Sequence, residues 1–278
     1  MATVRSLLAL SLVLSSSVAL AAPTALYGVG SGSGTGDSLW IVTNPAGPAT
    51  EVGSMGISAT AVTGLVTDPN DPSLYISDGA SVFSVSKATG ASTLIGASGL
   101  GSIEGLAIDG AGTMWAASGS TLATIAYTTS GVSTFVATLT NFYDDLAIAN
   151  SDINYSGGTI PAGSLLGIDA TGGGSSIYAI NTTTFAETLI DSVPLTVGDE
   201  ALTTDDAGRL LTHNFDRETG GLGGIYETDP LGTSSLLFTT TPAWNGMWFQ
   251  VGDEEVPTPA PLALLAVAGL LMLRRRTA

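Results

Sequence analysis

The 278-residue chain has seven Lys and Arg residues against 24 Asp and Glu, one His and no Cys. The lack of Cys excludes disulfide bonds and thiolate zinc sites. Four of the basic residues lie at the two ends, so residues 22–256 between them have three basic and 24 acidic residues, a net charge of −21. This charge excludes nucleic acid as a partner, because phosphate binding needs clustered Lys and Arg. The acidity favours divalent cations or basic partners, or serves only to keep an extracellular protein soluble.

Residues 1–21 follow the pattern of a secretory signal peptide. Arg5 supplies the positive charge, residues 7–14 are mostly apolar, and Ala19-Leu20-Ala21 offers a small-x-small cleavage site. We therefore predict an N-terminal signal helix that signal peptidase removes after Ala21. The body of the protein is expected to span residues 22–252.

The body contains five copies of a unit with four short apolar segments, and the apolar anchors of the opening segments are spaced 41, 40, 56 and 45 residues apart. The opening segments are 63–66, 104–107, 144–147, 200–203 and 245–248. The second segments are 26–28, 74–76, 114–116, 165–167 and 210–212. The third segments are 39–42, 82–85, 122–125, 177–180 and 225–228. The fourth segments are 50–53, 92–95, 133–136, 187–190 and 235–238.

Four short strands in every 40–45 residues is about the period of a β-propeller blade. The first unit lacks an opening strand, and the last opening strand, around Met247, has no unit after it. The sequence thus predicts an all-β, five-bladed β-propeller in which the C-terminal strand completes the first blade and closes the ring. A two-sheet sandwich is the alternative, but it does not explain the fourfold order within each unit. A right-handed β-helix would need shorter coils.

One unit also resembles a known class of repeats. Gly64-Leu65-Val66-Thr67-Asp68-Pro69, followed by Ser73-Leu74-Tyr75-Ile76, is similar to repeats of YVTN/SMP-30-like β-propellers. The resemblance supports the fold and implies no activity by itself.

The residue two positions before each opening anchor is an oxygen donor, namely Thr63, Glu104, Asp144, Glu200 and Asn245. First strands line the central channel of a propeller, so these side chains are expected to ring its mouth. Packed carboxylates repel one another unless a cation or protons compensate. Ca²⁺ takes six to eight oxygen ligands, which makes this ring a predicted calcium site. The alternative is that these residues cap strand ends and face water.

Complete catalytic motifs are absent from the sequence. His213 is the single histidine and lies in a predicted strand, and the chain has no Gly-x-Ser-x-Gly motif. Two carboxylates about 5–10 Å apart would suit glycoside hydrolysis. We therefore predict no catalytic residue and favour a non-enzymatic binding protein, with an extracellular carboxylate-dependent hydrolase or lyase acting on a glycan or lactone as the alternative. A purely structural matrix protein is the third class.

The C-terminal segment 253–278 has three parts. A proline-rich stretch leads into the apolar residues 262–273, and a cluster of three Arg residues follows. Twelve residues make a helix of about 18 Å, shorter than the roughly 30 Å hydrocarbon core. The Arg cluster is expected to stay cytoplasmic and thus to anchor the tail helix transiently in the inner membrane.

This layout resembles the PEP-CTERM sorting signal. The residues that correspond to it are Val256, Pro257, Thr258, Pro259, Arg274, Arg275 and Arg276. Thr258 stands where the family usually has Glu. The resemblance implies a Gram-negative host and removal of the tail by an exosortase, a membrane protease. We therefore expect the body to reach the cell surface or a biofilm matrix, where an extracellular polysaccharide or a surface protein would be its partner.

Overall fold

A computed structural model describes the central part of the chain. The described residues are 25–31, 37–43, 48–57, 62–69, 71–170, 175–193, 199–205, 209–214, 223–228, 235–240 and 244–250. They form strands and loops and contain no helix, which confirms the all-β prediction. Within them, accordingly, no helix is long and apolar enough to cross a membrane. The predicted signal peptide, the sorting tail and all its signature residues lie outside the described residues.

The strands form five large sheets, and within each the strands follow one another from edge to edge. The first sheet is β21 (Trp244–Gln250), β1 (Ala25–Ser31), β2 (Asp37–Val42) and β3 (Thr50–Ser54). The second is β4 (Thr63–Asp68), β5 (Asp71–Ser77), β6 (Ser81–Val85) and β7 (Ser92–Ala97). The third is β8 (Gly105–Ile108), β9 (Met114–Ile125) and β10 (Ser133–Tyr143). The fourth is β11 (Asp145–Ile148), β14 (Leu165–Asp169), β15 (Ser175–Ile180) and β16 (Glu187–Val193). The fifth is β17 (Asp199–Thr204), β18 (Leu210–Asn214), β19 (Gly223–Thr228) and β20 (Ser235–Thr240).

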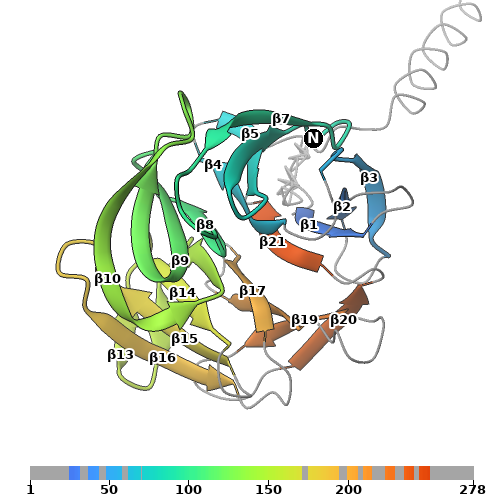
Figure 1. The fold of residues 1–278 in the computed structure, drawn as a ribbon. Helices are drawn as coiled ribbons and strands as arrows, with labels where there is room; N and C mark the ends of the chain where they lie inside the picture. Colours follow the sequence, from blue (N-terminus) through green and yellow to red (C-terminus); the bar gives the residue numbers. More distant parts are fainter. Residues whose placement is uncertain are drawn as a thin grey trace, which may run out of the picture.

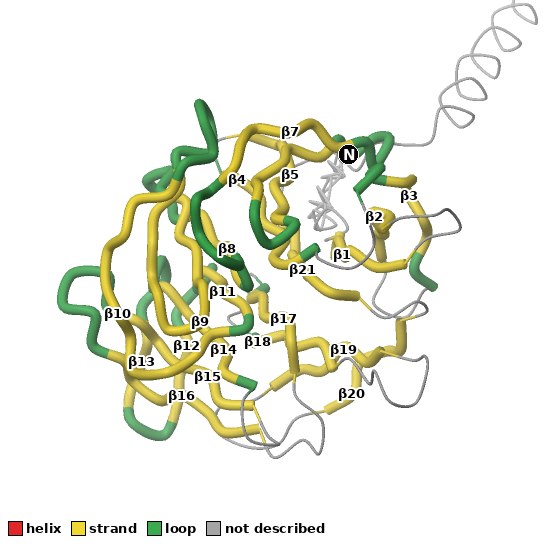
Figure 2. The backbone as a smooth tube through the Cα atoms, viewed as in Figure 1, coloured by secondary structure: helices red, strands yellow, loops and turns green. Residues whose placement is uncertain are grey.

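The five sheets are arranged around a common centre (Figure 1). The strands β4, β8, β11, β17 and β21 lie nearest this centre, and each contacts the next in cyclic order, with β21 contacting β4 again (Figure 2). The C-terminal strand β21 pairs antiparallel with β1, so that the first sheet contains both ends of the described chain. The predicted segments all coincide with strands, apart from Glu104 and Asp144, which come directly before β8 and β11.

The third sheet departs from the four-strand pattern. Its strand β9 pairs with β8 through residues 114–117 and with β10 through residues 119–125. β9 therefore contains two predicted segments, divided near Gly119, whose φ of 57° lies in the left-handed region that favours glycine. The fourth sheet is accompanied by a small hairpin, β12 (Ile153–Tyr155) and β13 (Gly158–Ile160), that the repeat pattern did not predict. This hairpin accounts for the long spacing of 56 residues.

The hydrophobic core is divided among the spaces between neighbouring sheets. Strand alternation sends successive side chains to opposite faces. Leu74 and Ile76 of β5 pack with the first sheet, whereas Tyr75 between them packs with the third. The other spaces are filled in the same way, including the one between the fifth and first sheets, where Leu211 and Leu26 belong to one cluster. Each sheet thus depends on both neighbours for burial.

Candidate binding site at the centre of the ring

The five predicted ring positions lie at the start of the inner strands. Thr63 begins β4, and its hydroxyl donates a hydrogen bond to the carbonyl oxygen of Ile103, which links the second and third sheets. Glu200 and Asn245 lie in β17 and β21, but their side chains are outside the described part of the structure. The geometry of the site is therefore built on Thr63, Glu104 and Asp144.

Glu104 and Asp144 lie close enough to interact electrostatically. The carboxylate of Glu104 accepts a hydrogen bond from the Gly119 N–H at 2.8 Å, and that of Asp144 accepts one from the Ala170 N–H at 2.7 Å. Burial raises the pKa of Asp144; the Ala170 N–H opposes this rise, and the negative charges of Glu104 and Asp169 add to it. Both side chains are half-buried, and the described residues donate no hydrogen bond to the second oxygen of either.

The neighbouring carboxylate, Asp145, has a structural role that the repeat pattern did not predict. Its side chain is 2% exposed and accepts N–H groups from Leu146 at 2.8 Å and Leu202 at 2.9 Å, together with that of Leu106. Burial raises its pKa well above the usual range, and these three donors oppose the rise. Because the donors belong to β8, β11 and β17, one carboxylate ties three inner strands together.

Small residues occupy the same position in the other repeats, which read Gly64, Gly105, Ala201 and Gly246. A Cβ atom on Gly105 would lie 2.6 Å from the backbone of Asp145, so the inner strands approach too closely there for a side chain. Asp145 stands where each of the other repeats has a small residue. This difference is the sequence signal that could have identified it.

An aromatic ring lies beside the two ring carboxylates. Phe142 is 52% exposed, and its ring covers Gly119 so closely that a Cβ atom there would lie 2.6 Å from it. Gly119 is the residue whose N–H binds Glu104, and Phe142 comes two residues before Asp144. The mouth of the ring therefore combines two carboxylates with an accessible aromatic face.

The segment that presents Phe142 is fixed by Glu187 at the start of β16. The Glu187 carboxylate accepts hydrogen bonds from the N–H groups of Thr140 at 2.6 Å and Asn141 at 3.1 Å, and from the Tyr143 hydroxyl at 2.7 Å. Burial would raise the pKa of Glu187, but these hydrogen bonds outweigh it and lower the pKa. This clamp holds the end of β10 against the fourth sheet.

A metal ion would need more ligands than the described carboxylates supply. Among the described residues, no group of three or more His, Cys, Asp or Glu side chains is arranged to hold a metal ion. The predicted calcium ring also includes Glu200, whose side chain lies outside that set. Calcium binding by the five-residue ring therefore stays a prediction.

His213 lies in β18 with no exposed surface, and burial lowers its pKa to about 3. It faces Ala201 across the β17–β18 pair and packs within the fifth sheet. Because the side chain is fully enclosed, a bound substrate cannot reach it, and we assign His213 a packing role.

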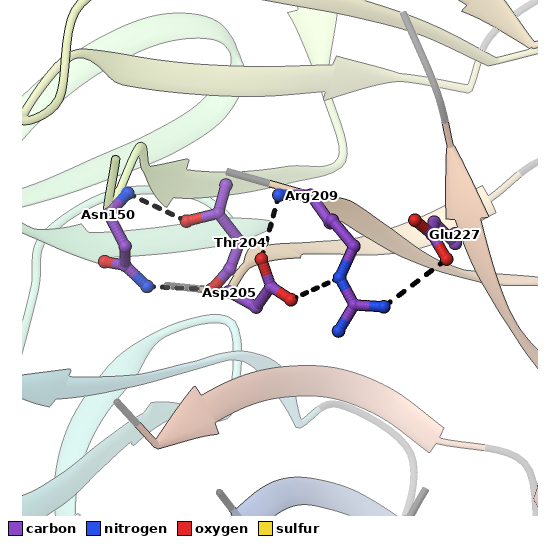
Figure 3. A network of polar contacts seen from close by, with 5 residues as sticks. All are labelled: Asn150, Thr204, Asp205, Arg209 and Glu227. Carbon is purple, nitrogen blue, oxygen red and sulfur yellow. Dashed lines mark hydrogen bonds and ion pairs between the residues drawn. The ribbon is translucent and has the colours of Figure 1, made fainter. Parts of the chain in front are cut away.

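At the end of the inner strands β11 and β17 opposite the ring residues, polar contacts join the fourth and fifth sheets (Figure 3). Asn150 donates from its backbone N–H to the Thr204 hydroxyl at 3.0 Å and from its side chain to the Thr204 carbonyl at 2.8 Å. Next to it, Asp205 binds the backbone N–H and the guanidinium of Arg209, which also reaches Glu227 at 3.4 Å. These donors have protein acceptors, so this network is structural.

Comparison with known proteins shows the fold. A chain in the crystal structure of a nidogen/laminin complex has a TM-score of 0.51 and 14% identity, over 82% of this chain and 98% of that one. TolB from Acinetobacter baumannii has a TM-score of 0.45 and 12% identity, over 79% of this chain and 53% of that one. Hydrazine synthase from Kuenenia stuttgartiensis has a TM-score of 0.41 and 11% identity, over 68% of this chain and 51% of that one. No family model matches the sequence, and no curated protein does. The likeness to the first of these structures confirms a β-propeller body and says nothing of function.

Proposed function

We propose that this chain is an exported five-bladed propeller, closed by β21, that binds an extracellular polysaccharide at the mouth of its central ring. The observation that carries the proposal is the placement of Phe142 beside Glu104 and Asp144. The second carboxylate oxygens can accept hydrogen bonds from sugar hydroxyls, and such bonds to charged acceptors are the strong ones. The accessible aromatic face offers a surface for the apolar side of a sugar ring.

The charge of the body narrows the class of polysaccharide. The net charge of −21 on residues 22–256 repels uronic acids and sulfated sugars and tolerates neutral or amino sugars. We therefore expect neutral or basic glycans to bind, and acidic glycans to be excluded.

Binding to arrays of neutral, amino and acidic oligosaccharides tests this function. Phe142→Ala and the double variant Glu104→Gln/Asp144→Asn should each weaken binding at least tenfold. Thr159→Ala, in the exposed strand β13, is the matched control and should bind as the parent does. Binding that is unchanged in both site variants would refute the site, and absence of binding to every glycan would refute the polysaccharide proposal.

The proposed location rests on the two ends of the sequence. The predicted signal peptide, the proline-led apolar tail and the Arg cluster support export and processing by an exosortase-type system. The mature protein would then occupy the cell envelope, outer surface or extracellular matrix of a Gram-negative bacterium. Intact-mass analysis of the secreted protein should show loss of the tail near Pro257. A mature protein that keeps Arg274 to Arg276 would refute this processing.

A glycan- or lactone-cleaving enzyme is the second candidate, and one observation favours it. Burial raises the pKa of Asp144, which lies beside Glu104, and a carboxyl group of raised pKa next to a second carboxyl group is the arrangement that general acid catalysis uses. The same glycans, incubated with the protein and followed by product analysis, decide between binding and cleavage. Turnover that disappears in Asp144→Asn would identify a hydrolase or lyase.

A further inference from the structure

Large apolar side chains are exposed along the outer edge of three consecutive sheets. Leu94 of β7 is 59% exposed, Phe135 of β10 is 63% exposed and Leu189 of β16 is 48% exposed. Each strand is the outermost of its sheet. All three residues occupy the same position, directly beside a β-bulge. Val132, which precedes β10, is 55% exposed.

The outer strands are connected into a continuous rim. The Ser92 hydroxyl of β7 donates to the Met55 carbonyl after β3 at 2.6 Å. The Ser133 N–H of β10 donates to the Ser98 carbonyl after β7 at 2.8 Å. The second bond holds the end of β7 beside the start of β10. We call the exposed apolar residues of these neighbouring segments, Leu94, Val132 and Phe135, the apolar rim.

The apolar rim lies in a part of the chain that lacks charge. Residues 88–103 and 110–143 contain no Asp, Glu, Lys or Arg, although residues 22–256 carry a net charge of −21. Natural edge strands are normally protected by charged residues or Pro, and neither β7 nor β10 contains either. In β10 only the last residues, which Glu187 binds, are protected by a carboxylate.

We propose that the apolar rim is a self-association surface, occupied by the same rim of a second copy of this chain. In a two-fold contact the same surface patch of both molecules meets, so a net charge on that patch would repel its copy. A charge-free face is therefore what two such acidic molecules require, whereas a basic partner would select the acidic faces. Burial of Phe135, Leu94 and Val132 from both copies supplies apolar area for association.

Cross-linking through a single introduced thiol tests this proposal in the full chain. Because the natural sequence has no Cys, Thr134→Cys next to Phe135 gives one reactive group on the rim. Thr159→Cys in the exposed hairpin strand β13 is the matched control. A short bismaleimide should link two copies of the Thr134→Cys protein and leave the Thr159→Cys protein monomeric. Adding Phe135→Lys or Phe135→Ser to Thr134→Cys should reduce the cross-linked fraction at least fivefold.

The dependence on salt separates a second copy from other causes of association. Salt screens the repulsion between two acidic bodies, so the cross-linked fraction should rise as ionic strength increases from about 0.01 M to about 0.5 M. A basic contaminant bridging two molecules would give the opposite trend. Equal cross-linking of both thiol variants, or a fraction unaffected by Phe135→Lys and Phe135→Ser, would overturn the proposal. Circular dichroism of each variant checks that the fold is retained.

Discussion

Replacing Asp145 by Ala tests whether one buried carboxylate holds the centre of the propeller. The substitution leaves the N–H groups of Leu106, Leu146 and Leu202 without their acceptor in a site that is closed to water. A buried donor without a partner costs about 1–3 kcal/mol. Burial of the carboxylate is itself unfavourable, as the raised pKa of Asp145 indicates. Its removal therefore offsets part of the stability lost with the three hydrogen bonds. We expect a net loss of about 2–4 kcal/mol in the free energy of unfolding.

The adjacent residue provides a matched control. Asp144→Ala removes a carboxylate of the same size that is half-buried and binds a single N–H, that of Ala170. Its effect on stability should stay below about 1 kcal/mol. Urea unfolding at pH 7, followed by tryptophan fluorescence and by circular dichroism, measures both variants. If the two substitutions lower stability equally, or if Asp145→Ala unfolds at the same urea concentration as the parent, the carboxylate does not tie the inner strands together.

Further predictions concern the ring, its closure and the enclosed histidine. His213→Gln should be less stable than the parent at pH 7, and this difference should shrink as the pH falls to 4. The pKa of His213 is about 3 in the folded protein and near 6.5 in the unfolded chain, so protonation of the unfolded chain lowers the parent's free energy of unfolding by about 3 kcal/mol over this range. Parallel pH dependence of the two proteins would contradict this. Deleting residues 247–251 should expose the edge of β1, lower the melting temperature and cause aggregation; a monomer that melts with the parent would refute closure by β21. If the ring binds Ca²⁺, a hundredfold excess over Kd should raise stability by about 2.7 kcal/mol, and Glu104→Gln with Glu200→Gln should abolish the gain. The calcium prediction fails if melting shows no shift, or a shift that survives in the double variant.

The order of strands could be predicted from the sequence because each repeat places its apolar residues at the same phase. That periodicity reports burial between sheets, and the structure buries Leu65, Leu106 and Leu146 as predicted. The site was less predictable, because its geometry depends on departures from the repeat. Periodicity identified Asp144 as a ring residue but gave no reason to separate it from Asp145, whose partners come from three different strands. The contact of Phe142 with Gly119 joins residues whose proximity depends on a bulge, which leaves no periodic signal.

These departures from the repeat gather at one place. The continuous strand β9, the long strand β10, the substitution of Asp145 for a small residue and the added hairpin β12–β13 all belong to the third and fourth sheets. A repeat that served only to build a ring would have no reason to vary more at one junction than at the others. Here the repeat brings Glu104 of the third sheet beside Asp144 of the fourth, and the variation adds the Glu187 clamp that fixes Phe142 next to them. The junction of the third and fourth sheets therefore offers a ligand features found nowhere else in the described part of the ring. This supports a binding site at that junction rather than over the fivefold ring as a whole.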